Sequence, residues 1–183
     1  PNVHVQIQEA ADIAEMEEWL ANGYVDLCFF SLIRSGPFEY INLVDDPMMV
    51  VLYPGHPLAK KRAIALEDLK DEPLLLAANP RGLDYDVAKV LSEASFTPRI
   101  EATSNLDHII FSMVQHHLGI SIEAALMLTD KENAAVLRPF DPPQSRRLVM
   151  AARSFRTLSP AANQFVSHTK AALRKMEPDR ILF

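Results

Sequence analysis

The sequence predicts an α/β protein built as two similar lobes, and three observations carry this prediction. Short apolar runs typical of buried strands alternate with segments that have helical periodicity. The strand–helix–strand order at the start of the chain recurs in the middle. A length of 183 residues fits one domain or two small lobes built together.

The first 30 residues predict a β-α-β unit. Residues 3–7 alternate apolar and polar side chains, which is the pattern of a half-buried strand. Asp12 and Glu15 have the spacing of a capping box, and Gly23 suits the position after a helix. The apolar run 25–30 is typical of the buried strands of parallel sheets. We therefore expect a right-handed unit over residues 3–30.

The middle of the chain repeats this plan. Further strands are predicted over residues 48–53, 74–78, 99–103 and 120–122, and helices over 66–69, 87–94 and 104–117. Ser104 is expected to cap the last of these helices, and Gly119 to end it.

The final segment predicts a return to the first lobe. A proline link at 141–143 precedes an expected strand over 148–152, and Ser159-Pro160 is a strong helix start. The chain would cross between lobes near residues 53–72 and near 141–147. The predicted division is lobe I over 1–53 and 147–183, and lobe II over 54–146. Such folds bind small ligands in the crevice between lobes.

Charge is distributed unevenly along the chain. Residues 1–52 carry nine acids and one base, whereas residues 147–183 carry seven bases and two acids. The two ends are therefore electrically complementary and could pack in one lobe, although charge blocks are as often solvated faces.

Composition excludes several classes of protein. The net charge of −6 argues against a domain that binds DNA by itself. The single cysteine, Cys28, excludes an internal disulfide and fits a cytoplasmic location. Apolar runs such as 48–53 are too short to span a bilayer, and no signal peptide is evident.

No motif predicts an enzyme, a cofactor or a metal. The stretch 119–123 lacks the second glycine of a nucleophile elbow, and no phosphate loop or dinucleotide fingerprint is present. His108, His116 and His117 do not have the spacing of a standard metal site. His56, in a Pro-Gly-His-Pro turn, and Cys28, in an apolar run, are expected to be structural.

Several motifs, in order, resemble one known family. They are Pro1-Asn2-Val3-His4-Val5, Leu-Ala-Asn-Gly-Tyr-Val-Asp-Leu-Cys-Phe at 20–29, Val-Leu-Tyr-Pro-Gly-His-Pro-Leu-Ala at 51–59, Leu-Glu-Asp-Leu-Lys-Asp-Glu-Pro at 66–73, the Leu-Gly-Ile-Ser core of 114–122, and Leu-Ser-Pro-Ala-Ala within 153–165. Together they cover nearly the whole chain. The chain resembles the effector-binding domain of LysR-type transcriptional regulators.

The resemblance implies a two-lobed fold of the type 2 periplasmic-binding-protein kind. It implies a homodimer formed through the strand and helix after Glu9 and the helix at 104–118, with higher oligomers possible. A small metabolite would bind between the lobes and change the geometry of DNA-binding domains. The sequence begins at what looks like the family's second strand, so the winged helix-turn-helix and the first strand and helix are not part of it. DNA would then be bound only through that N-terminal domain.

The resemblance also implies which residues contact the effector. They lie in three loops and in the Leu-Gly-Ile-Ser core, namely Phe30, Ser31 and Leu32, then Asn79, Pro80, Arg81 and Gly82, then Thr103, Ser104 and Asn105, and finally Ser121. A helix N-terminus with nearby hydroxyl and amide groups favours an anionic effector. Ser104 could equally be a plain helix cap, and Arg81 an exposed loop residue.

Three functions follow from these observations, with the first preferred. The chain is expected to be a small-molecule sensor module of a transcriptional regulator. The alternatives are a solute-binding protein and a small-molecule enzyme on the same fold. An upstream helix-turn-helix, a cleaved signal sequence or turnover of a substrate would distinguish the three.

Overall fold

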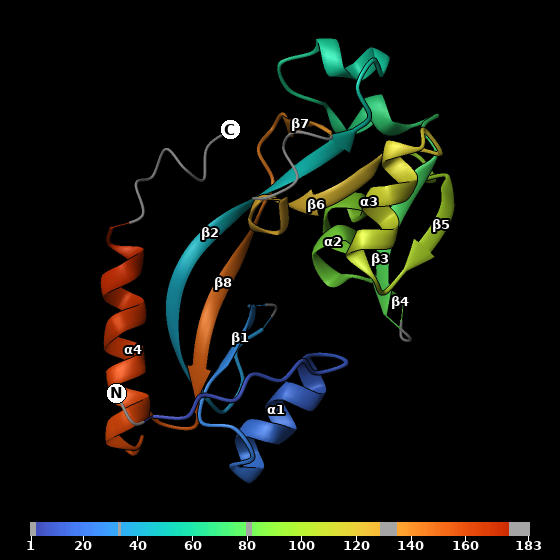
Figure 1. The fold of residues 1–183 in the computed structure, drawn as a ribbon. Helices are drawn as coiled ribbons and strands as arrows, with labels where there is room; N and C mark the ends of the chain where they lie inside the picture. The colour runs from blue at the N-terminus through green and yellow to red at the C-terminus, as the bar shows by residue number, and fades with distance from the viewer. Residues whose placement is uncertain (1–2, 33, 80–81, 129–134, 176–183) are drawn as a thin grey trace. The chain divides into compact units, whose positions relative to one another are not determined.

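The computed structural model describes residues 3–32, 34–79, 82–128 and 135–175. The described chain divides into two compact units (Figure 1). The first unit combines residues 3–45 with 147–175, so both ends of the described chain belong to it. The second unit comprises residues 46–146. Residues 46–53, which are predicted to belong to lobe I, pack in the second unit.

The first unit is a small sheet with two helices. Helix α1 (Ile13–Asn22) precedes strand β1 (Cys28–Ser31), which pairs antiparallel with β8 (Ser145–Ala152). The last helix of the described residues is α4 (Pro160–Leu173), which buries only a narrow stripe that includes Ala162 and Val166. The core of this unit is formed by Leu20, Cys28, Phe30, Val149 and Ala151.

The predicted helix caps are confirmed in this unit. The Asp12 side chain accepts the Glu15 N–H at 3.0 Å, and the Glu15 carboxylate returns to the N–H of Ala11. Gly23 ends α1 with a φ of 70°, a left-handed conformation that favours glycine. Ser159 caps α4 by accepting the Ala162 N–H at 3.2 Å.

Two predictions for the start of the chain are wrong. Residues 3–10 form no strand, and Val3, Val5 and Ile7 are 56%, 55% and 90% exposed. The alternating pattern gives a strand only where a neighbouring strand pairs with it, and none does so within the described residues. The run 25–30 contains an antiparallel strand rather than the parallel one expected, because its partner is β8.

The second unit combines strands of two sheets, with a helix packed on each side of β3. Its strands are the end of β2 (Glu39–Leu52), β3 (Leu74–Asn79), β4 (Gly82–Leu83), β5 (Ile100–Ser104), β6 (Ser121–Ala124) and β7 (Val136–Pro139). Its helices are α2 (Tyr85–Ser92) and α3 (Asp107–Gln115), with short 3₁₀ turns η1 (Pro57–Lys60), η2 (Leu66–Leu69) and η3 (Ala125–Leu128). Strand β3 pairs parallel with β5, whereas β2 pairs antiparallel with β6 and β7.

Strand β3 separates two layers of core. Leu74 and Leu76 pack in the cluster that includes Val87 and Val90 of α2. Leu75 points the other way, into the cluster that includes Ile110 and Val114 of α3. Successive side chains of a strand face opposite sides, so one apolar run fills both layers. In the part of the chain that the structure describes, no helix is long and apolar enough to cross a membrane.

The Glu39 carboxylate fixes the turn that leads into α4. It accepts the Phe155 N–H at 2.7 Å and the Ser154 hydroxyl at 3.0 Å. The Phe155 N–H is the main reason why the pKa of Glu39 lies below its ordinary value of 4.5, with Ser154 and the nearby Arg156 acting in the same direction. Glu39 therefore connects the start of β2 with residues 154–155, which precede α4.

This contact predicts a stability that depends on pH. Because the folded-state pKa is lowered, the stabilisation is present above the ordinary value of 4.5 and is lost as the pH falls through and below it. The change Glu39→Gln should reduce stability at pH 7 and flatten this part of the acid dependence. Urea unfolding at pH 7 and pH 4 measures both effects, with the exposed Glu101→Gln as control. An unchanged acid dependence in Glu39→Gln would contradict the assignment.

Candidate functional site

The second unit brings two of the three predicted loops to one edge of its three-stranded sheet, β4-β3-β5. In the β3–β5 ladder, Leu76 lies opposite Thr103 and Ala77 opposite Ser104. The strands are parallel, so their carboxyl ends meet at the same edge. Asn79, the last residue of β3, and Asn105, the residue after β5, therefore lie at the same edge of the sheet. Thr103 and Asn105 are exposed, and Ser104 is half-buried.

The turn between β5 and α3 is held by Ser104, but not as a helix cap. Its hydroxyl accepts the Leu106 N–H at 3.0 Å. The N-cap position belongs to Leu106, whose side chain makes no cap hydrogen bond. The expectation that Ser104 caps α3 is therefore wrong by two positions, because the hydroxyl closes the preceding turn instead. As a result, no N-cap side chain satisfies the leading N–H groups of α3.

The loop after β3 is described only in part. Asn79 lies opposite Gly82 in the short β3–β4 ladder. Gly82 has a φ of 139°, which favours glycine, and nothing would contact an added Cβ there. Pro80 and Arg81 lie outside the described residues. Their predicted role, including an ion pair from Arg81 to an anionic effector, stays a prediction.

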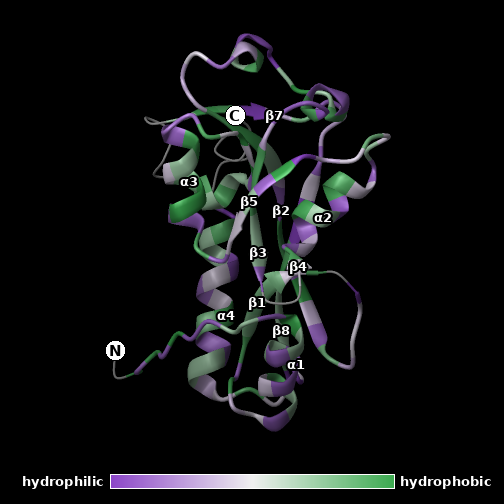
Figure 2. Ribbon diagram, turned by 90° about the vertical axis from the view of Figure 1, so that its right-hand side faces the viewer, coloured by the Kyte–Doolittle hydropathy of each residue, from purple (hydrophilic) through white to green (hydrophobic). Residues whose placement is uncertain are grey.

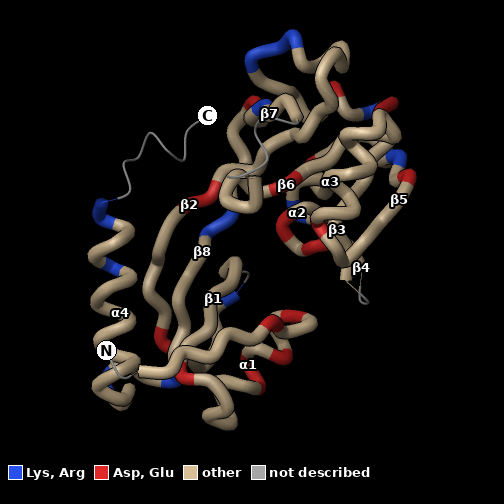
Figure 3. Tube along the Cα trace, in the orientation of Figure 1, with Lys and Arg blue, Asp and Glu red and all other residues tan. Residues whose placement is uncertain are grey.

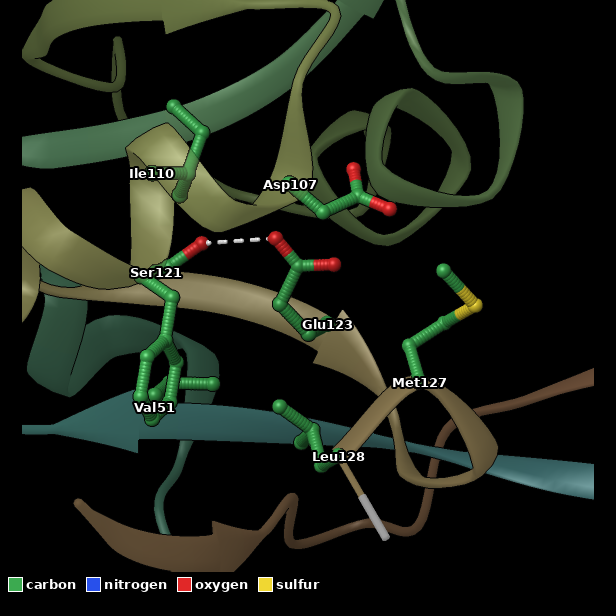
Figure 4. A pocket seen from close by; sticks show the side chains of 8 residues that line it. Val51, Asp107, Ile110, Ser121, Glu123, Met127 and Leu128 are labelled. Atoms are coloured by element: carbon green, nitrogen blue, oxygen red, sulfur yellow. Dashed lines mark hydrogen bonds between the residues drawn. The ribbon is translucent and has the colours of Figure 1, made fainter. Parts of the chain in front are cut away.

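Ser121 lies deeper than the other predicted residues of this unit. It is 1% exposed in β6, and its hydroxyl is 3.2 Å from the Glu123 carboxylate. Both residues line a hollow together with Asp107 and Met127 (Figure 4). The cavity volume is about 10 Å³, room for about one water, whereas metabolite pockets are several hundred Å³. This hollow alone cannot hold a metabolite.

Two acids at this hollow were not expected from the sequence. Asp107 stands in the first turn of α3, and Glu123 is in β6. The two acids are 16 positions apart in the sequence, and the fold brings them to one hollow. Two carboxylates at this hollow disfavour the binding of an anion there.

The third predicted loop belongs to the first unit. Phe30 is 7% exposed and packs edge-on against Tyr40, with ring centroids 6.4 Å apart. The Leu32 N–H donates to the Arg147 carbonyl at 2.8 Å, and the Leu32 side chain packs on the core. Ser31 is half-buried. The Phe30 and Leu32 side chains thus have core contacts, and an effector contact of this loop stays a prediction.

Two histidines have structural contacts. The His56 ring accepts the Leu58 N–H at 3.2 Å, and its other ring nitrogen lies 3.3 Å from a Glu72 carboxylate oxygen. His117 stacks on Tyr53, with centroids 4.2 Å apart and ring planes 14° apart. Over the described ranges, no group of three or more potential ligands is placed to hold a metal ion.

Cys28 is a packed core residue. It is 7% exposed, and burial raises the pKa of its thiol from 9.0 to about 11. Its Sγ lies 3.7 Å from the Met16 carbonyl oxygen. A thiol with a raised pKa has little thiolate at neutral pH, and the thiolate is the reactive form.

Cys28 should therefore react slowly in the folded protein. At pH 8 we expect iodoacetamide to modify it at least about a hundredfold more slowly than an exposed thiol introduced by Ser92→Cys, because much less thiolate is present. Mass spectrometry over time, native and in urea, measures the two rates. Equal rates in the native protein would show that Cys28 is accessible.

Comparison with known proteins identifies the family. The sequence profile of the LysR substrate binding domain matches residues 1–174. The uncharacterized HTH-type transcriptional regulator YwbI of Bacillus subtilis is 30% identical over 176 residues, which are 94% of this chain and 58% of that protein. The relatives are named transcriptional regulators and not enzymes, in agreement with the sequence analysis.

Solved structures show the same fold. The Synechocystis PCC6803 CcmR regulatory domain, in complex with 2-PG, has a TM-score of 0.77 at 20% identity, covering 88% of this chain and 80% of that one. The effector binding domain of QuiR in complex with shikimate has a TM-score of 0.73 at 23% identity, covering 90% and 79%. The predicted type 2 periplasmic-binding-protein-like fold is therefore confirmed.

The chain matches only part of the length of its curated relatives. The chain spans between 56% and 58% of the length of three curated Bacillus subtilis relatives. Their names describe helix-turn-helix regulators, and the part that this chain matches is the family's ligand-binding region. The chain belongs to the LysR substrate binding domain family, the effector-binding domain of LysR-type transcriptional regulators.

Proposed function

We propose that this chain is the sensor of a transcriptional regulator and binds a small effector at the edge where β3 and β5 end. The family match over residues 1–174 carries the proposal. It is supported by the CcmR and QuiR domains, which are described with 2-PG and shikimate bound. The residues proposed to contact the effector are those of the two described loops of this edge, Asn79, Gly82, Thr103, Ser104 and Asn105.

The chemistry of this edge suggests how an effector is held. The uncapped N-terminus of α3 offers backbone donors for an anionic group. The exposed Asn105 amide and Thr103 hydroxyl add directional hydrogen bonds. Asp107, in the first turn of α3, would repel a second negative charge on the effector. We therefore propose a small polar metabolite with a single anionic group and several hydroxyl or amine groups.

Ligand-induced stabilisation tests this proposal. A panel of carboxylates, sugar phosphates, amino acids and neutral analogues is screened by thermal unfolding of the whole chain. A ligand at about 100 times its Kd should add about 2.7 kcal/mol. Asn105→Ala should weaken binding about tenfold, since it removes a hydrogen bond to a charged or polar group. Ser92→Ala, on the exposed side of α2, is the control and should leave the affinity unchanged. Equal affinities of the two variants would reject the edge as the site.

DNA binding is proposed for the remainder of the full-length protein. The relatives are helix-turn-helix regulators of which this chain spans little more than half. The net charge of −6 argues that this domain itself does not bind DNA. A regulator that acts on DNA works in the cytoplasm, and we propose that location.

Dimerisation is the second part of the proposal. Helix α3 and its flanks expose apolar side chains, with Leu106, Ile109 and Leu118 at 48%, 41% and 54% exposure. Hydrophobic stretches of α3 are visible in Figure 2. Val3, Val5 and Ile7 form another exposed apolar set. Exposed apolar patches are typical of interfaces, and we propose that a second copy of the chain covers these surfaces.

Light scattering with size exclusion tests the dimer. At tens of micromolar we expect a dimer, and Ile109→Asp should shift it to monomer because it places a charge in the apolar contact. Phe165→Asp is a matched control, since Phe165 is also 41% exposed but lies on α4. A monomeric parent protein, or dissociation by both changes alike, would overturn the assignment of α3.

A further inference from the structure

The chain passes between its two units at two neighbouring places. The first crossing falls between Asp45 and Asp46 in β2, and the second between Arg146 and Arg147 in β8. The two strands are neighbours in one sheet and run side by side (Figure 1). Next to the crossing, the Met48 N–H donates to the Gln144 carbonyl at 2.9 Å. Both crossings are therefore parts of one two-stranded ribbon.

An ion pair joins the strands on the second-unit side of the crossing. Arg146 donates from Nε and from Nη2 to the same Asp46 carboxylate oxygen, each at 2.9 Å. The Asp46 side chain is fully buried and that of Arg146 is 17% exposed. In Figure 3, an acidic stretch of β2 lies beside a basic stretch of β8. Loss of one partner would leave the other charge buried and unpaired.

This pair is anchored to the rest of the second unit. The other Asp46 carboxylate oxygen accepts the Leu126 N–H of η3 at 3.0 Å. Arg146 Nη1 lies 4.0 Å from a carboxylate oxygen of Asp86, in the first turn of α2. Helix α2 follows directly on β4, which contains Gly82 of the proposed effector edge. The pair thus connects both crossing strands with η3 and α2.

The adjacent residues form a different kind of pair on the first-unit side. Arg147 Nε donates to Asp45 at 3.0 Å, and the two side chains are 55% and 62% exposed. Neighbouring residues of a strand face opposite sides, so the same two strands are bridged once in the interior and once in water. An exposed pair is screened by solvent and constrains the strands little.

We infer that Asp46 and Arg146 form a clamp that fixes both crossing strands to the second unit. Bending between the units is then confined to the first-unit side, at Asp45 and Arg147. Arg146 is a positioning residue, because it acts on the strands and on α2 rather than on a ligand. Only the significance of this bending for signalling rests on the proposed function; the clamp itself is a property of the ligand-free chain.

Residue-resolved amide exchange of the ligand-free chain tests the clamp. The Leu126 and Met48 amides report on the second-unit side, and the Leu32 amide, bonded to the Arg147 carbonyl, reports on the first. Arg146→Met should accelerate exchange at Leu126 and Met48 about tenfold or more, because hydrogen bonds to charged groups are strong and their loss opens the structure locally. The Leu32 amide should change by less than about threefold.

The matched control is Arg147→Met, which removes the same group one residue along the strand. It should leave the Leu126 and Met48 amides unchanged within about threefold. Equal effects of the two variants, or no effect of Arg146→Met, would overturn the clamp. If Arg146→Met fails to fold, Arg146→Lys keeps the charge but loses the two-pronged contact, and it should give the same pattern more weakly. Unchanged exchange at Leu126 and Met48 in Arg146→Lys would likewise reject it. Since no ligand is used, failure of the clamp is distinguishable from failure of the effector proposal.

Discussion

The architecture of the second unit depends on the parallel pairing of β3 with β5. Leu74, Leu75 and Leu76 of β3 are fully buried, and they face the two core layers alternately. Each such side chain contributes about 1.5–3 kcal/mol of burial free energy, so the strand is held firmly from both sides. The pairing also determines where β3 and β5 end, and hence where their following loops lie. The proposed effector edge is a consequence of this packing and needs no bound ligand to form.

A close backbone contact beside β3 reinforces this arrangement. Gly119 stands where an added Cβ would lie 2.4 Å from the Pro73 carbonyl oxygen. The absence of a side chain lets the Ile120 N–H reach that same carbonyl at 2.9 Å, and lets the Leu75 N–H reach the Ile120 carbonyl. The glycine of the Leu-Gly-Ile-Ser motif is thus explained by close approach of two backbone segments. This contact aligns the start of β6 with β3.

The sequence patterns predicted the buried elements well and the unpaired ones poorly. The runs at 48–53, 74–78 and 148–152 are strands in the structure, because continuous burial leaves an unambiguous apolar signal. Residues 3–7 have an equally good alternating pattern, yet a strand needs a partner that local sequence does not specify. For the site, the sequence allowed the prediction that the loops after β3 and β5 lie at one edge of the sheet. The burial of Ser121 and the presence of both Asp107 and Glu123 at one hollow could not be predicted, because they depend on contacts between distant segments.

The charges at the crossing show why a charge count is insufficient. The sequence contains two adjacent acids at 45–46 and two adjacent bases at 146–147, which from the sequence could all be solvated. In two neighbouring strands, alternation sends one pair inward and the other into water. The same chemical groups then differ in consequence, since only the interior pair is protected from solvent screening. The electrostatic complementarity of the chain's ends is therefore less informative than the face of the strand on which each charge stands.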